Sequence, residues 1–479
     1  MTRTSFADTT KELFRNSLLP VLAIIAGVMI GGSGFSIPVF LLLIAAGILV
    51  MYSISHNVAN GLFFLIAAGY FSVGLTRYVT YPLGLTIDFI LVLVFIIFFL
   101  KRFKQITWAP LRNPAFIAVS AWMVINILEL GNPEAHSFEA WFYAMRGVSL
   151  YFFLTLLLGY LLLSYKNHFD KFIMVWFACS LLGTLWGIKQ LYFGLDEAET
   201  IWLNVPGNLT THVLFGKLRV FSFYSDAGQF GASQAHAGLV ATILAINEKR
   251  KPYKIFFLLV TIMSFYGMLI SGTRGAFAIP VIGFFAYLIL IKNWKIIIAG
   301  SIAFISVFGV LKFTFIGQGV YEIQRLRSSL NPDDPSLRVR LENQRKLKVY
   351  LNSHPLGGGI GSAGYWGLRF TPYTFLANLP LDSWYVRIAA EFGYTLFLIY
   401  IAILVMIMYH AQKKIRNTIN ADEKNKLIAL FCGLGGILVA SYGNQVFGQM
   451  PTGIIMYLSI VFLTKNESSK ENTYERNVS

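Results

Sequence analysis

The sequence predicts an all-α polytopic integral membrane protein, with about 12–14 transmembrane helices and a large extracytoplasmic loop that contains helical segments. The chain has 479 residues, of which 56% are hydrophobic and only 13% are charged. Apolar runs of roughly 20 residues, the length that crosses a bilayer, recur along most of it. Basic residues are concentrated in the short connections between these runs. This distribution excludes a soluble protein carrying a single membrane anchor.

The predicted spans follow one another through most of the chain and form a single transmembrane domain, residues 1–464. A polar tail, residues 465–479, follows them. The spans are expected near 17–34, 36–53, 57–75, 82–100, 113–130, 147–164, 171–191, 227–247, 254–271, 275–291, 295–314, 384–409, 427–444 and 449–464.

Loop charge sets the expected orientation. Lys and Arg are enriched in cytoplasmic loops of membrane proteins, so the basic connections are assigned to the cytoplasm. They are 101–105, 165–171, 247–254, 292–295 and 413–426. Both termini then lie in the cytoplasm, and the longest connections, 192–226 and 315–383, lie on the extracytoplasmic face of the membrane.

Charge and cysteine content exclude several function classes. The net charge of +16, from 39 Lys and Arg against 23 Asp and Glu, is explained by the cytoplasmic loops, and no aromatic-basic pattern indicates nucleic-acid binding. Cys179 and Cys432 lie inside apolar runs, where cysteine behaves as a small hydrophobic residue. The sequence therefore predicts no metal site and no redox cofactor.

Arginines at the predicted outer face are the first candidates for a binding site. They are Arg146, Arg219 and Arg274, the last within "SGTRGAFAI" at 271–279. A single outer arginine can also be a snorkelling anchor. Several arginines from separate connections would suit a diphosphate, because the planar guanidinium matches phosphate oxygens.

The outer loop 315–383 has internal organisation. After a polar turn at 327–336, Leu337, Leu341, Leu347 and Leu351 recur at helical spacing among basic residues, which predicts a helix on the membrane surface. Arg338 and Arg340 lie on this helix. Pro355 ends it, and the glycines that follow allow tight turns or close approach of a ligand to the backbone.

Asp382 and Ser383 immediately precede the apolar run that returns the chain to the membrane. Both residue types are good N-caps of helices. A carboxylate at the outer surface beside a basic loop also fits a general base acting on a hydroxyl nucleophile. Asp382 is therefore a candidate catalytic residue, and Ser383 a weaker candidate for substrate contact.

The order of these elements resembles the O-antigen ligase and polymerase superfamily of bacterial surface-polysaccharide enzymes. The stretches that carry the resemblance are "LRVFSFYSDAGQFGA" at 218–232, "SGTRGAF" at 271–277, "RLENQRKLKVYLNSHPLGGGIG" at 340–361 and "LDSWYVRIAAEFG" at 381–393. The third is the most specific, since the family favours an arginine followed about one helix later by His-Pro and a glycine-rich turn.

The resemblance implies a glycosyltransferase of the inner membrane with its active site on the periplasmic face. Its donor would be a polyprenyl-diphosphate-linked oligosaccharide and its acceptor a glycan or a lipid-linked glycan, with no cofactor and no metal. Arg219, Arg274 and Arg340 would bind the diphosphate; Arg340 fits the family spacing better than Arg338. Contributions from Arg146, His354, Ser383 and Gly358 are expected to be weaker.

The chain departs from the family at one position, because family ligases typically carry a histidine where this sequence has Asp382. An aspartate remains able to activate an acceptor hydroxyl, but assignment as a lipid A-core ligase is weakened. The sequence favours a polymerase that joins lipid-linked repeat units into O-antigen or exopolysaccharide. The alternatives are an O-antigen ligase, a protein O-oligosaccharyltransferase and, in another class, a flippase for lipid-linked oligosaccharides. Oligomeric state is left open.

Overall fold

The structure is a computed structural model that describes residues 47–79, 83–102, 108–214, 216–291, 294–316, 319, 323–324, 327 and 335–466. The chain divides into two units, Met1–Gly61 and Leu62–Ser479. The predicted span 17–34, most of the span 36–53, most of the turn 327–336 and the tail beyond residue 466 lie outside the described residues.

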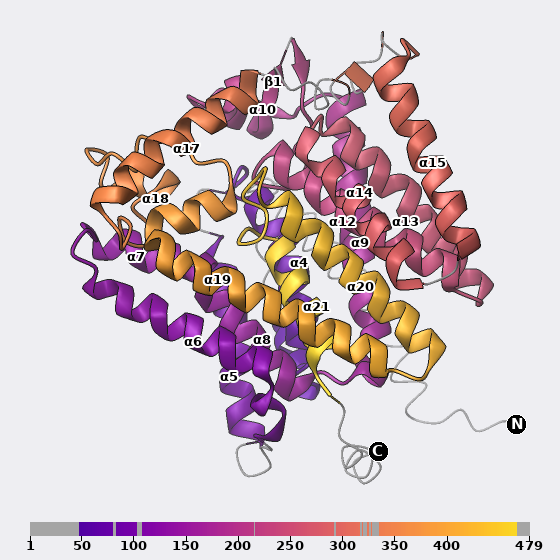
Figure 1. The fold of residues 1–479 in the computed structure, drawn as a ribbon. Helices are drawn as coiled ribbons and strands as arrows, with labels where there is room; N and C mark the ends of the chain where they lie inside the picture. The colour runs from indigo at the N-terminus through magenta and orange to yellow at the C-terminus, as the bar shows by residue number, and fades with distance from the viewer. Residues whose placement is uncertain are drawn as a thin grey trace, which may run out of the picture. The chain divides into compact units, whose positions relative to one another are not determined.

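Helices account for nearly all regular structure in the described residues (Figure 1). The longer ones are α4 (Asn60–Leu75), α5 (Leu85–Arg102), α6 (Pro114–Leu128), α7 (Phe138–Met145), α8 (Tyr151–Leu162), α9 (Tyr165–Tyr192), α12 (Ala227–Asn247), α13 (Lys251–Ile270), α14 (Ala278–Ile291), α15 (Trp294–Phe313), α17 (Pro335–Ser353), α19 (Trp384–Asn417), α20 (Ala421–Ala440) and α21 (Thr452–Thr464). The short ones are α10 (Glu197–Leu203), α11 (Asn208–His212), α18 (Gly364–Phe370), η3 (Ala109–Arg112), η4 (Glu129–Gly131), η5 (Arg146–Leu150) and η6 (Arg274–Phe277).

The predicted all-α polytopic membrane class is confirmed. Strand structure in the described residues is limited to β1 (Val213–Leu214) and β2 (Lys217–Leu218), an antiparallel pair. Six helical segments among the described residues are long and apolar enough to cross a membrane. They are Pro114–Gly131, Phe138–Leu162, Tyr165–Tyr192, Lys251–Ile270, Arg274–Ile291 and Trp384–Asn417. The total of about 12–14 spans stays a prediction.

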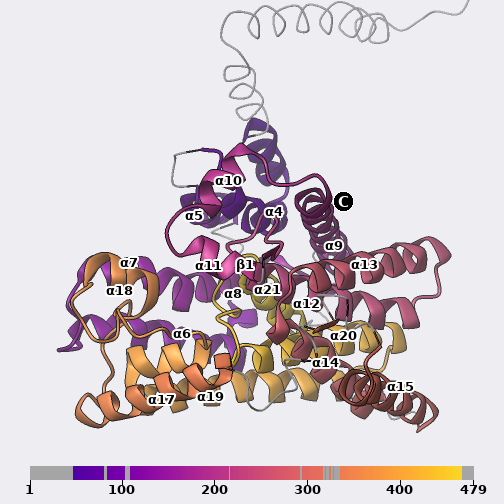
Figure 2. The ribbon, with the colours of Figure 1, turned by 90° about the horizontal axis from the view of Figure 1, so that it is seen from above.

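Helix α21 is enclosed by other helices, and every one of its 13 residues is buried. It packs against α8, α9, α19 and α20, and Figures 1 and 2 show it behind α19 and α20 and among the other helices. Helix α12 packs against α13, α14 and α20. These contacts bring the start of α12 and the α20–α21 connection to the same region as the start of α19.

Helix α17 confirms the helix predicted around residues 337–351. Its buried residues Leu347 and Leu351 join a hydrophobic cluster with Leu376, Leu379 and Ala390. This side of α17 therefore packs on α19 and on the segment that leads into it. Arg340 lies about two turns before Leu347 on the same side of the helix. Its side chain therefore reaches the start of α19, where it contacts Asp382.

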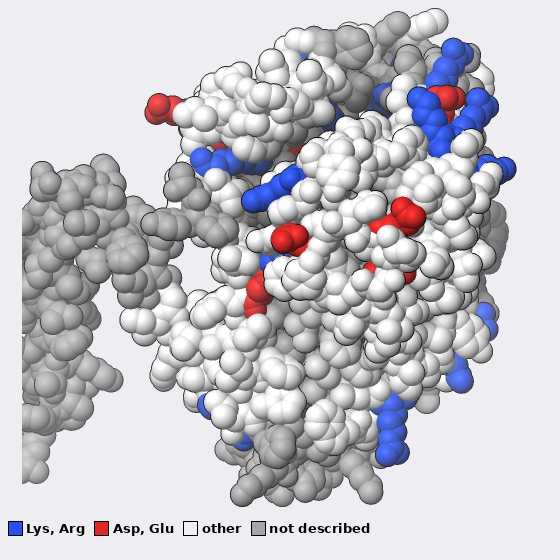
Figure 3. Space-filling model, turned by 90° about the vertical axis from the view of Figure 1, so that its left-hand side faces the viewer, with Lys and Arg blue, Asp and Glu red and all other residues white. Residues whose placement is uncertain are grey.

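Two irregularities lie beside the candidate site. Between α7 and α8 the chain forms one π-helical turn, η5, a feature often found at functional sites. Helix α19 is kinked at Gly393, whose φ of 72° and ψ of 175° are not helical. On the face shown in Figure 3, most charged side chains lie in the upper half, and the centre of the face below them is largely uncharged, as expected where a surface meets lipid.

Candidate active site

A cavity of about 510 Å³ opens where five segments meet. These segments are the α7–η5 junction, the start of α12, helix α18, the start of α19 and the α20–α21 connection. The lining residues are Tyr143, Ala144, Gly147, Val148, Asp226, Gly228, Gln229, Gly364, Tyr365, Trp366, Leu381, Asp382, Trp384, Arg387, Asn444, Gln445, Val446, Gly448 and Gln449. A concave site with convergent polar groups is the usual form of an active site.

Asp382 is the predicted catalytic residue that lines this cavity. Its carboxylate is 57% exposed and does not cap the following helix, because the side chain of Ser383 accepts the hydrogen bond from the Val386 amide instead. Nε of Arg340 donates to Oδ2 of Asp382 at 3.1 Å. The structure thus brings two of the predicted residues into contact. Because Ser383 is the N-cap of α19, capping does not account for Asp382.

Neither Arg340 nor its competitor Arg338, which is also on α17, is among the described lining residues of the cavity. Arg340 contacts a lining residue, Asp382, whereas Arg338 is exposed. Ser383 is buried behind Asp382 and serves as the N-cap. Its loss is expected to weaken the start of α19 by about 1 kcal/mol.

Arg387 is a lining residue that the sequence reasoning did not select. It is the only Lys or Arg among the described residues that line the cavity. Its Nε donates to Oε1 of the fully buried Glu391 at 3.0 Å, and its Nη1 donates to Oε1 of Gln445 at 3.2 Å. The signal was present in the sequence as an Arg-Glu pair at i, i+4 in a helix next to Asp382.

The glycine-rich turn, predicted to allow tight turns or close approach of a ligand, wraps around the kink of α19. The amides of Gly358 and Gly359 donate to the carbonyls of Ala390 and Glu391, both at 2.9 Å. A Cβ atom on Gly393 would collide with the carbonyl oxygen of Pro355. Gly358 is not among the described lining residues of the cavity, and the turn supports the helix that carries Arg387.

His354 begins this turn and is packed on the protein. Its ring stacks on Tyr350 with centroids 4.1 Å apart and an interplanar angle of 5°. Its Nε2 lies 3.9 Å from Oε2 of Glu134. These contacts give the side chain a structural role at the end of α17.

Arg219 and the "SGTRGAF" segment, which are far apart in sequence, are joined. The Arg219 guanidinium donates from Nη2 to Oγ1 of Thr273 at 3.0 Å and from Nε to the carbonyl of Ser271 at 3.4 Å. Thr273 in turn donates to the carbonyl of Ala227 at 2.8 Å, at the start of α12. The structure therefore brings Arg219 next to the residues that immediately precede Arg274.

Arg274 begins η6 and is half-buried. Neither it nor Arg219 is among the described lining residues of the cavity. The connection is close, however: a Cβ atom at Gly275 would lie 2.9 Å from the side-chain nitrogen of Asn444, and Asn444 lines the cavity. The two arginines thus belong to the segments that back the cavity wall.

Arg146 is not among the described lining residues of the cavity and is paired with Asp88. Its Nη1 lies 2.8 Å from Oδ2 of Asp88, and the hydroxyl of Tyr151 also donates to this carboxylate at 3.0 Å. Asp88 falls within the predicted span 82–100. Pairing offsets the cost of placing it there, and it ties α5 to the π-helical turn.

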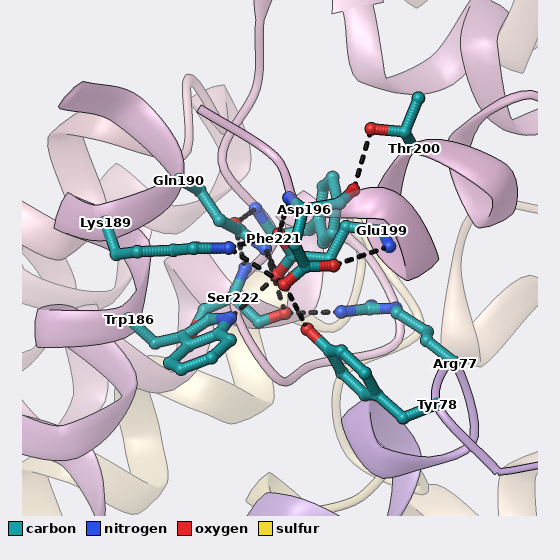
Figure 4. Close-up of polar contacts among 10 residues, drawn as sticks. All are labelled: Arg77, Tyr78, Trp186, Lys189, Gln190, Asp196, Glu199, Thr200, Phe221 and Ser222. Carbon is teal, nitrogen blue, oxygen red and sulfur yellow. Dashed lines mark hydrogen bonds and ion pairs between the residues drawn. The ribbon is translucent and has the colours of Figure 1, made fainter. Parts of the chain in front are cut away.

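A polar cluster beneath residues 219–226 sets the path of that segment (Figure 4). Oε1 of Gln190 accepts hydrogen bonds from the amides of Phe221 and Ser222, and Arg77 donates to the carbonyl of Ser222. Burial lowers the pKa of Arg77 to about 10, which leaves it charged at neutral pH. The cluster positions the segment that runs from Arg219 to Asp226.

The centre of this cluster is Glu199, which is fully buried. Its carboxylate accepts from Trp186 and Gln190, each at 2.7 Å, and from Lys189 at 2.9 Å. These three donors come from α9, and the Asp196 amide also donates to the carboxylate at 3.1 Å. Figure 4 shows the three side chains converging on it. Such a network is stabilising only when each member is paired, as it is here.

In the comparison with known proteins, one family model matches part of this chain. Residues 258–401 match the family model described as O-antigen ligase. The resemblance inferred from the sequence is confirmed over that segment, which contains Arg274, Arg340 and Asp382; Arg219 and Arg146 lie outside it. No curated protein matches this chain.

Proposed function

We propose that this protein is a glycosyltransferase of the bacterial inner membrane that joins lipid-linked repeat units into a surface polysaccharide. Its donor is a glycan carried on a polyprenyl diphosphate, and its acceptor is a hydroxyl of another lipid-linked glycan at the periplasmic face. The match to the O-antigen ligase family over 258–401 supports a transferase of this general type. The departure at Asp382 favours the polymerase over the lipid A-core ligase.

The observation that carries the proposal is that Asp382 lines the cavity and is paired with Arg340, while Ser383 serves as the N-cap. In the proposed step the acceptor oxygen attacks the anomeric carbon of the donor sugar. The carboxylate of Asp382 takes the hydroxyl proton. As the new glycosidic C–O bond forms, the bond from the anomeric carbon to the diphosphate oxygen breaks, and the diphosphate leaves on the polyprenyl carrier.

Arg219 and Arg274 act in this proposal on the leaving group. The departing diphosphate gains negative charge, and a guanidinium positioned for its oxygens lowers the barrier. Support comes from the hydrogen bonds between Arg219 and residues 271–273, because they bring the two arginines to adjacent segments at the wall of the cavity.

The test is a glycan profile of a deletion strain carrying the wild-type gene, Asp382→Asn or Arg274→Lys, with membrane levels of each protein measured. A polymerase predicts single-repeat product without the gene, and the same defect in both variants at normal protein level. Arg274→Lys keeps the positive charge but loses the planar guanidinium, which can bind phosphate through two parallel hydrogen bonds. Polymer of normal length in both variants would reject the catalytic assignment. Accumulation of unattached, full-length lipid-linked polymer in the deletion strain would identify a ligase instead.

A further inference from the structure

One wall of the cavity is aromatic. Tyr143 of α7 stacks on Trp366 of α18 with centroids 4.8 Å apart and an interplanar angle of 15°. Tyr365 stands edge-on to Trp366 at 4.8 Å and is 67% exposed. All three side chains line the cavity. Phe370 lies on Tyr143 at 5.7 Å without lining it, so it supports the wall from behind.

The other lining residues are mostly polar but carry little positive charge. They present the carboxylates of Asp226 and Asp382 and the amides of Gln229, Asn444, Gln445 and Gln449. Arg387, the cation among the described lining residues, is held by Glu391 and Gln445. Carboxylates at the surface of a cavity repel a diphosphate.

This combination suits an uncharged sugar ring. The axial C–H groups of a pyranose make one face apolar, and that face packs on an aromatic ring, while the ring hydroxyls donate to carboxylates and exchange hydrogen bonds with amides. Neither Arg219 nor Arg274 is among the described lining residues, so the chemistry of the cavity differs from that of the arginine segments behind it.

We propose that Tyr143, Tyr365 and Trp366 form a sugar-binding subsite for the acceptor glycan. The inference rests on the proposed function. The acceptor is chosen over the donor because Asp382 lines the same cavity, and a general base must reach the hydroxyl that it deprotonates. The diphosphate of the donor then stays with the arginines outside this cavity.

The test is binding to the purified full-length protein in lipid nanodiscs. The probe is the oligosaccharide released by mild acid from the lipid-linked repeat unit of the host strain, which has no diphosphate, and binding is followed by saturation-transfer NMR and calorimetry. We expect Tyr365→Ala and Trp366→Ala to weaken binding about tenfold, the effect of losing one aromatic contact. Trp366→Phe, which keeps a ring face, recovers most of the affinity.

The matched control is Tyr373→Ala. Tyr373 is 76% exposed and follows the same helix, but it is not among the described lining residues of the cavity. Its removal leaves binding unchanged. Equal affinity of wild type, Tyr365→Ala and Trp366→Ala would overturn the subsite, and so would binding that requires the diphosphate.

Asp382→Asn separates the subsite from the proposed function. In the nanodisc assay this variant still binds the oligosaccharide within a few-fold of wild type, because the amide keeps the size of the side chain; in cells it makes no polymer. Normal polymer from the Asp382→Asn strain would reject the proposed reaction while the binding assay still decides the subsite. Loss of polymer with unchanged binding in both aromatic variants would reject the subsite alone.

Discussion

The guanidinium Nε of Arg340 lies 3.1 Å from a carboxylate oxygen of Asp382, and the two residues come from different elements, α17 and the start of α19. Arg340 is 36% exposed and Asp382 57%, so the pair is open to solvent. Exposed ion pairs contribute little to stability, at most about 1 kcal/mol. The pair is therefore better explained by positioning of the carboxylate at the cavity than by a contribution to folding.

Removing the arginine tests this relationship. Arg340→Gln should shorten the polymer or lower the transfer rate, because Asp382 loses the group that holds its orientation, while the melting temperature changes by no more than about 2 °C. Chain-length profiles and thermal unfolding of the purified protein provide the measurement. Arg345→Gln is the matched control, since Arg345 is on the same helix, 82% exposed and paired only loosely with Glu342 at 3.8 Å. Equal activity of the two variants would exclude a positioning role for Arg340.

The kink of α19 predicts that a methyl group added at Gly393 will strongly destabilise the protein. Gly393→Ala should destabilise the protein by more than the roughly 1–3 kcal/mol of a forbidden backbone conformation, because the new Cβ also meets the carbonyl of Pro355. The amount of folded protein in detergent, measured by fluorescence-detected size exclusion after heating, reports the loss.

Gly194 supplies the comparison for this variant. It also has a positive φ, 86°, but no heavy atom lies within 4 Å of the position that a Cβ atom would take there. Gly194→Ala should therefore cost only the backbone strain. A loss as large as that of Gly393→Ala would show that the contact with Pro355 is not the cause.

The buried carboxylate of Glu199 predicts a second stability effect. Glu199→Ala removes the acceptor for Trp186, Gln190 and Lys189, and we expect a loss of about 3 kcal/mol, the lower end for a buried pair, because Lys189 keeps its contact with Asp196 at 2.9 Å. Thermal unfolding measures it. Glu197→Ala, an exposed change on the same short helix, should stay within about 0.5 kcal/mol; similar losses for both would remove Glu199 from the centre of the network.

The predicted orientation can be tested with single cysteines. The native Cys179 and Cys432 are buried, so they give little background. In spheroplasts, a membrane-impermeant maleimide should label Arg345→Cys on α17 without lysis, and Ile419→Cys, which is 98% exposed between α19 and α20, only after lysis. The opposite pattern would place the cavity on the cytoplasmic side and would contradict the use of a periplasmic lipid-linked substrate.

Part of the candidate site was readable from local sequence. Asp382 and Ser383 precede an apolar run, which marks a helix start, and a cap bond depends only on residues next to one another in the chain. The basic helix of the outer loop follows from leucine spacing in the same way. Which of the two residues caps was decided by packing: Ser383 is buried against the α20–α21 side, with its Oγ 3.5 Å from the carbonyl of Ser441, and this leaves Asp382 to face Arg340.

The sequence by itself determined the membrane class and the helical architecture, and it selected the candidates Arg219, Arg274, Arg340 and Asp382, because hydropathy, helix periodicity and charge are properties of neighbouring residues. Only the tertiary structure decided which of these meet. It joined Arg219 to residues 271–273, paired Arg146 with Asp88, and placed Arg387 in the same cavity as the aromatic residues of α7 and α18. Such pairings depend on how helices that are far apart in the chain pack together. The composition and residue spacing of one sequence do not give the distances between such helices.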